Sequence, residues 1–105
     1  MDTDEKDIAD RPLFLVVTIR PRLDRLDAAH AQLLQLRRIA LTEPGCVFMH
    51  LVRPQDDPTV WMMLEMFRSR GAWDEHMARP DNLAGNRILE PLLRAPSDLR
   101  LCDPL

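Results

Sequence analysis

The stretch Val60-Trp61-Met62-Met63-Leu64-Glu65-Met66-Phe67 decides the fold prediction, because it is apolar at every position except Glu65. A strand that has one face in water alternates apolar and polar side chains. This stretch does not alternate, so we expect a strand with both faces covered. A chain of 105 residues has few elements with which to cover both faces of a sheet. The pattern therefore predicts a partner subunit.

Three further strands are predicted, over residues 13–19, 46–52 and 98–102. Residues 46–52 are apolar on both faces except at His50, and the turn-forming segment 54–58 joins them to the strand at 60–67. These two strands are therefore expected to pair as an antiparallel hairpin. Side chains alternate between the two faces of a strand, so within residues 46–52 we expect His50 to lie on the same face as Cys46, Phe48 and Val52.

A first helix is predicted over residues 24–41. Its apolar side chains recur at spacings of three and four, at Leu26, Ala29, Leu33, Leu36 and Ala40. Asp24 is the expected N-cap, and Asp27 favours the positive end of the helix dipole. Pro44-Gly45 is the expected stop, because proline disfavours helical geometry before it and glycine permits the turn.

A second helical region is predicted over residues 71–79 and 83–93, interrupted at Pro80 and capped again at Asp81 or Asn82. The resulting order is βαββααβ. This is the order of a ferredoxin-like α+β fold, in which helices cover one face of an antiparallel sheet. The other face would be bare in a monomer, so the apolar strands predict a homodimer that pairs sheet against sheet.

Composition restricts the class of protein. Residues 1–11 hold five acids and no apolar segment, so we expect a solvated, disordered tail followed by one domain over 12–105. The net charge of −3 gives no basic surface for nucleic acid, and no stretch reaches the ~20 apolar residues of a membrane helix. Cys46 and Cys102 lack metal-ligand spacing and are expected to be reduced thiols in the cytoplasm, with no metal site.

Four local patterns together resemble the antibiotic biosynthesis monooxygenase family, whose members are dimeric α+β barrels. They are Glu43-Pro44-Gly45-Cys46, Asp56-Asp57-Pro58, Glu65 two positions before Phe67, and residues 72–76 with Pro80 four residues later. The resemblance covers residues 12–105. It implies oxidation of a phenolic, quinol-like or polyketide-type aromatic compound by dioxygen without a cofactor, in a pocket between the sheet and the helices.

The same resemblance places His76, Trp73, Phe67 and Asn86 around this pocket. The chain departs from the family pattern at Phe67, where many members carry Trp, and at Asp81, where many carry a second His. The residues used by the haem-degrading branch fall at Thr18, His76 and Asn86. That triad is absent, so haem degradation is not predicted. The chain also has no tyrosine with which to hold a substrate oxygen, as some quinone-forming relatives do.

His76 is the candidate catalytic residue. It follows Trp73 by three residues on a predicted helix, so the two side chains share a face. A neutral imidazole can take or give a proton at physiological pH, and removing a proton from a phenol gives an anion that can reduce dioxygen. The alternative is a structural histidine that packs beside Trp73 with its nitrogens satisfied.

Glu65 and Trp61 complete the candidate substrate-binding set. Glu65 interrupts an apolar strand, where a carboxylate is costly unless it is paired. It is either a pocket acid with a raised pKa or a buried acceptor tied to the backbone or to an arginine. Trp61 and the cluster Met49, Met62, Met63, Met66 and Met77 are either pocket walls or ordinary packing.

Two functional hypotheses follow. The first is a cytoplasmic homodimeric monooxygenase in which His76 moves protons, Trp73 and Phe67 form apolar walls and Asn86 positions the substrate. The second is a non-catalytic, dimeric small-ligand-binding or accessory protein that keeps the fold without the chemistry. Phe67, Asp81 and the absence of tyrosine favour the second hypothesis, and the Trp73/His76 pair favours the first.

Overall fold

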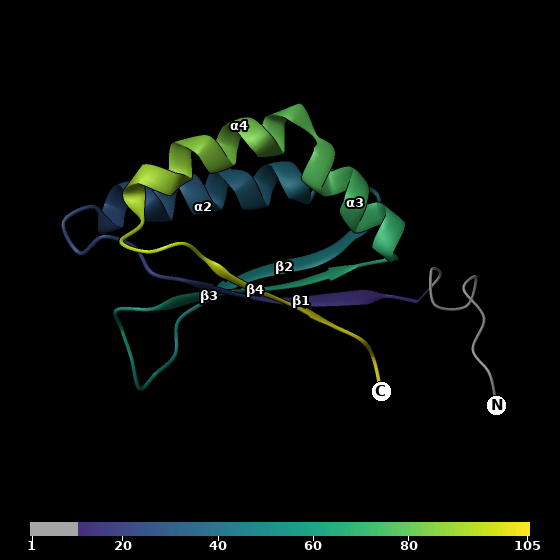
Figure 1. The fold of residues 1–105 in the computed structure, drawn as a ribbon, viewed down its shortest axis with the longest axis horizontal. Helices are drawn as coiled ribbons and strands as arrows, with labels where there is room; N and C mark the ends of the chain where they lie inside the picture. Colours follow the sequence, from purple (N-terminus) through teal and green to yellow (C-terminus); the bar gives the residue numbers. More distant parts are fainter. Residues whose placement is uncertain (1–10) are drawn as a thin grey trace.

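The computed structural model describes residues 11–105, which form one antiparallel sheet with helices packed against it (Figure 1). In chain order the elements are β1 (Leu13–Ile19), α2 (Leu26–Ala40), β2 (Cys46–Val52), β3 (Trp61–Phe67), α3 (Arg70–Ala78), α4 (Pro80–Leu89), the 3-10 helix η1 (Glu90–Leu92) and β4 (Asp98–Cys102). The strands are ordered β2-β3-β1-β4, and all neighbours are antiparallel. The predicted ferredoxin-like α+β fold is confirmed. The predicted tail at 1–11 lies, apart from Arg11, outside the described residues.

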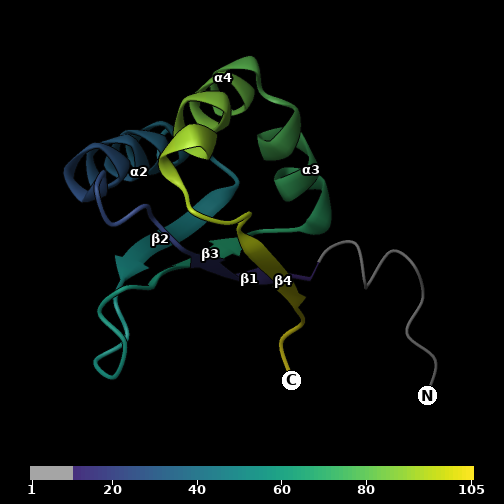
Figure 2. The same ribbon diagram turned by 60° about the vertical axis from the view of Figure 1, so that its left-hand side comes forward.

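All the helices lie on one side of the sheet (Figures 1 and 2). Every second residue of the strands faces them, and α2 contributes the buried stripe that its spacing predicts. The core between the two layers contains Leu13, Leu15, Ile19, Leu33, Leu36, Ala40, Met49, Met63, Phe67 and Leu89. Removing such side chains from water stabilises the fold by roughly 1.5–3 kcal/mol each when burial is complete.

Among residues 11–105, no helix covers the opposite side of the sheet (Figure 2). The residues that alternate with the core positions meet there across the strands, as in the pairs of Phe14 and Phe48 with Met66. We call this surface the outer sheet face and define it by Phe14, Val16, Phe48, Val52, Met62, Leu64 and Met66. All seven are at least partly exposed, and Val52 reaches 40%. The prediction that one chain leaves an apolar sheet face bare is confirmed.

A β-bulge changes the predicted facing of β2. Cys46 pairs with Phe67, but Phe48 pairs with Met66, so Val47 is an additional residue in the strand. The bulge lets Cys46 point into the core while Phe48, His50 and Val52 point to the outer sheet face. The prediction that Cys46 shares a face with these three residues is therefore wrong. The imidazole of His50 stacks on the Phe48 ring with 5.0 Å between centroids.

The helix ends also differ from prediction. The N-cap of α2 is Arg25, not Asp24, because the Asp24 carboxylate accepts hydrogen bonds from the Arg22 guanidinium instead. Helix α4 begins at Pro80, whose fixed φ suits the first helical position, so Asp81 and Asn82 are not its cap. The predicted helix at 83–93 is the continuation of α4 followed by η1. Within residues 11–105 no helix is long and apolar enough to cross a membrane.

Two glycines permit close packing beside the helices. Gly45 does not adopt a positive φ, so its role is not the left-handed turn that the Pro-Gly pair suggested. A Cβ at Gly45 would lie 2.6 Å from Cβ of Ala72, which shows how closely the turn approaches α3. A Cβ at Gly85 would lie 2.4 Å from the Leu36 side chain, so Gly85 sets the distance between α4 and α2.

Candidate functional site

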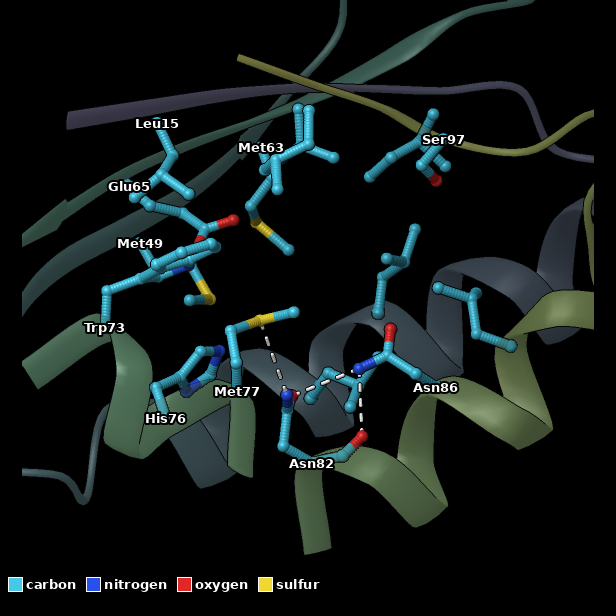
Figure 3. A pocket seen from close by; sticks show the side chains of 16 residues that line it. Leu15, Met49, Met63, Glu65, Trp73, His76, Met77, Asn82, Asn86 and Ser97 are labelled. Atoms are coloured by element: carbon cyan, nitrogen blue, oxygen red, sulfur yellow. Dashed lines mark hydrogen bonds between the residues drawn. The ribbon is translucent and has the colours of Figure 1, made fainter. Parts of the chain in front are cut away.

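A cavity of about 220 Å³ lies between the sheet and the helices (Figure 3). Most of its wall is apolar and comes from strands β1–β4 and from the helices α2, α3 and α4. Its polar side chains are Glu65, His76, Asn82, Asn86 and Ser97. Among the residues described, no arginine or lysine lines the cavity, and no group of three or more His, Cys, Asp or Glu is placed to hold a metal ion.

His76 is held by Glu43, a residue that lies 33 positions earlier in the chain. Helix α3 begins where the Ser69 hydroxyl accepts a hydrogen bond from the Ala72 amide, and this start turns His76 inward. His76 and Glu43 are each only 7% exposed, and Nδ1 of His76 lies 2.9 Å from Oε2 of Glu43. A carboxylate only accepts, so Nδ1–H donates to Glu43, and in the neutral imidazole Nε2 is the acceptor. The ring points toward the cavity (Figure 3).

The Glu43–His76 pair reaches the surface through Arg79. The Nε atom of Arg79 lies 3.8 Å from Oε2 of Glu43, and the same guanidinium binds Asp81 through two hydrogen bonds. Asp81 thus occupies the end of a polar chain that runs from the surface to the buried imidazole. The hydrogen bond to Glu43 holds the His76 ring in one orientation.

Glu65 is the second titratable group in the cavity. It lies in β3, is 9% exposed and points into the cavity beside Trp73 and Met63 (Figure 3). Within residues 11–105 no hydrogen bond and no arginine contributes to its pKa. Burial raises its pKa to about 7, so near neutral pH it is present in both protonation states. The geometry therefore matches the pocket-acid interpretation of Glu65 and not that of a tied acceptor.

The structure brings four of the six predicted site residues to one cavity: His76, Trp73, Asn86 and Glu65. Phe67 is fully buried behind the wall, and its ring lies 4.9 Å from the His76 ring, so it supports the imidazole without reaching the cavity. Trp61 lies elsewhere, with its ring 5.8 Å from that of His30 on α2. Three methionines line the cavity, namely Met49, Met63 and Met77, whereas Met62 and Met66 belong to the outer sheet face.

Sequence reasoning missed Glu43 and Asn82. Glu43 was visible as part of the motif at 43–46, but nothing local connects it with a histidine on another helix. Asn82 is 5% exposed, and it accepts from the Asn86 amide through both its backbone and its side-chain oxygen. The spacing of four between two asparagines on one helix was the available signal. Cys46, by contrast, is inert: burial above all, with Glu65 and Glu43 nearby, raises its pKa to about 11.

A ferredoxin-like sheet, helices on one face and a partly open cavity between them define a small α+β protein with a pocket between its two layers. The profile of the antibiotic biosynthesis monooxygenase family matches residues 12–87. The chain belongs to this family, and its membership indicates a monooxygenase at the family level.

Solved structures share the fold over nearly the whole chain. Rv0793 from Mycobacterium tuberculosis is 29% identical, with a TM-score of 0.83 over 90% of this chain and 95% of that one. PA3566 from Pseudomonas aeruginosa is 25% identical, with a TM-score of 0.81 over 92% and 97%. SnoaB, a cofactor-independent oxygenase from Streptomyces nogalater, is 16% identical, with a TM-score of 0.80 over 90% and 93%, and shows the fold alone. No curated protein sequence matches the chain.

Proposed function

We propose that the protein is a monooxygenase that oxidises a small phenolic or quinol-like compound with dioxygen and without a bound cofactor. The observation that carries this proposal is the buried Glu43–His76 pair, which presents Nε2 of His76 to a cavity that also contains Glu65. Such a pair is the arrangement of an oriented general base. The description of SnoaB as a cofactor-independent oxygenase supports the extension to this chain.

The chemistry needs only protons, dioxygen and an electron-rich ring. Nε2 of His76 takes the phenolic proton, and the resulting anion reduces dioxygen as a C–O bond forms at a ring carbon. Protonated Glu65 donates to the peroxide anion and gives a hydroperoxide. The C–H proton at that carbon then returns to Glu65 and the O–O bond breaks. The leaving hydroxide takes the proton from His76 and departs as water. Overall, a phenol and dioxygen give a quinone and water.

The cavity favours a compact, uncharged substrate. An engineered apolar cavity of ~150 Å³ is large enough to bind benzene. The cavity of about 220 Å³ therefore suits one substituted ring better than three fused rings. It offers a carboxyl group and amides but no cation, so a carboxylate or phosphate on the substrate would be disfavoured.

The test of function is oxygen uptake. The protein is mixed with hydroquinones, naphthols and anthrone in turn, and dissolved oxygen is followed against buffer and heat-denatured protein. We expect enzyme-dependent uptake that is faster for one-ring than for three-ring compounds. Binding of the same compounds with no oxygen consumption would contradict the proposal and favour the alternative, a non-catalytic ligand-binding protein.

The proposed enzyme is a cytoplasmic homodimer. Two copies of the outer sheet face are self-complementary, so pairing sheet against sheet would cover all seven of its residues from water. The described cysteines, Cys46 and Cys102, are free thiols, as in a reducing compartment.

Replacing Leu64 by Glu is expected to convert the dimer to monomers, because it places a charge near the centre of the outer sheet face, between Val16 and His50. Analytical ultracentrifugation measures the mass. The control is Leu83→Glu, since Leu83 is 44% exposed on α4, away from the sheet. A wild-type chain that sediments as a folded monomer at micromolar concentration would refute the dimer.

A further inference from the structure

Asn86 presents an acceptor to the cavity, not a donor. Its side-chain nitrogen donates to the backbone oxygen of Asn82 at 2.9 Å and to the Asn82 side-chain oxygen at 3.1 Å. A backbone carbonyl can only accept, so the amide nitrogen of Asn86 must face it. The Asn86 oxygen is then directed away from Asn82, toward the space between α4 and the sheet (Figure 3).

Asn82 makes this orientation rigid. Its own side chain is buried, and its amide nitrogen contacts the sulfur of Met77 at 4.0 Å, which leaves its oxygen for Asn86 (Figure 3). A flip of the Asn86 amide would set its oxygen against two other oxygens. Asn86 therefore cannot adapt by turning its amide, and its polarity toward a ligand is fixed.

Asn86 and His76 stand at different ends of the same cavity. His76 projects from α3 beside Trp73 and Glu65, while Asn86 projects from α4 toward Ser97 (Figure 3). Each presents a hydrogen-bond acceptor, Nε2 in one case and the amide oxygen in the other. A ring that carries two O–H groups on opposite sides has one donor for each acceptor. If carbonyl or ether oxygens replace the two O–H groups of the ring, the Asn86 oxygen faces another acceptor and forms no hydrogen bond.

From this geometry we propose that Asn86 is a specificity-determining residue that binds the second O–H of a para-diol and selects the diol over a para-quinone. The inference rests on the proposed function, because His76 must engage the first O–H. A second hollow, which Glu90 and Arg94 help to line, shares Asn86, Leu89 and Ser97 with the cavity. Asn86 thus lies where the cavity meets the outside, and a product that it does not bind is free to leave.

The experiment measures binding without turnover. Hydroquinone, 4-methoxyphenol and 1,4-dimethoxybenzene are titrated into the full-length protein under nitrogen, and Kd is obtained by calorimetry. These probes present two, one and no O–H donors on rings of similar size. We expect hydroquinone to bind about three- to tenfold more tightly than 4-methoxyphenol, the cost of leaving one acceptor unpaired at a site that water can reach. The dimethoxy compound is expected to bind most weakly.

Variants at position 86 make the test specific. Asn86→Leu is expected to bind hydroquinone and 4-methoxyphenol equally, because leucine has no acceptor to pair with the second O–H. Asn86→Ala serves if the leucine variant does not fold. Arg87→Ala, one residue along α4 and outside the cavity, is the matched control and should behave as wild type.

Two results would overturn the inference, and they are distinguishable. If the wild type binds phenols but shows no preference, or if the preference survives in Asn86→Leu and Asn86→Ala, the role of Asn86 is refuted while the proposed function stands. If the wild type binds none of the three compounds and consumes no oxygen with any phenol, the proposed function fails and the inference fails with it.

Discussion

Replacing His76 by alanine is expected to lower kcat for a phenolic substrate by about 10²- to 10⁴-fold, the usual contribution of a general base. The variant removes Nε2, the acceptor that faces the cavity, and leaves Trp73 and Glu65 in place. KM is expected to change less, because the apolar wall that holds the ring is retained. Steady-state oxygen uptake at several substrate concentrations separates the two constants.

Two further variants isolate the role of this histidine. His30→Ala is the matched control, since His30 is exposed on α2 and does not line the cavity. Glu43→Gln keeps an acceptor for Nδ1–H but removes the charge that stabilises an imidazolium, so its kcat is expected to fall less than that of His76→Ala. A His76→Ala enzyme that turns over at the wild-type rate would exclude His76 from the chemistry.

Replacing Glu65 by glutamine is expected to stabilise the protein at pH 8.5 by on the order of 3 kcal/mol, and to have little effect near pH 4.5. Burial raises the pKa of Glu65 from 4.5 to about 7 in the folded chain. Between these values the native state keeps a proton that the unfolded state has lost. The contribution of Glu65 to the stability of the wild type therefore falls as the pH rises from 4.5 through 7 and is constant above. Glutamine has no charge to bury, so it removes this loss.

Urea unfolding of the wild type and the variant gives the change in the free energy of unfolding that the substitution causes at pH 5 and at pH 8.5. The prediction is tested by comparing these two changes. Glu75→Gln is the control, because Glu75 is exposed on α3. An equal change in the free energy of unfolding at both pH values would show that Glu65 is not protonated in the native state at neutral pH. The same titration bears on catalysis, since the proton that Glu65 donates to peroxide is lost as the pH rises through about 7.

The fold was predictable because its signals are local. The hairpin, the helical spacing in α2 and the apolar run in β3, which only Glu65 interrupts, each depend on neighbouring residues. Together they predict the ferredoxin-like order. The apolar outer sheet face followed from the same patterns. Three local predictions were wrong because no strong sequence signal marked the cause. Asp24 binds Arg22 and does not cap α2, α4 begins at Pro80, and a bulge after Cys46 changes the facing of β2.

The site was predictable only in part, because its contacts join distant segments. His76 and Glu65 are conspicuous in the sequence, but Glu43 meets His76 only after the turn at 43–46 packs against α3. Phe67 was predicted as a cavity wall from the family pattern. It lies behind His76 instead, where it packs against the imidazole ring and does not reach the cavity. The polarity of Asn86 depends on the amide of Asn82, which no spacing rule specifies.

The bulge in β2 also determines how this strand tolerates a change of length. Val47 is one residue more than the ladder with β3 requires, since Cys46 and Phe48 pair with the adjacent residues Phe67 and Met66. Deleting Val47 would leave an uninterrupted strand with Met49 still inward and His50 still outward. Deleting any residue between Met49 and Val52 would instead reverse the facing of the segment beyond it. Length variation among related chains should therefore concentrate at position 47.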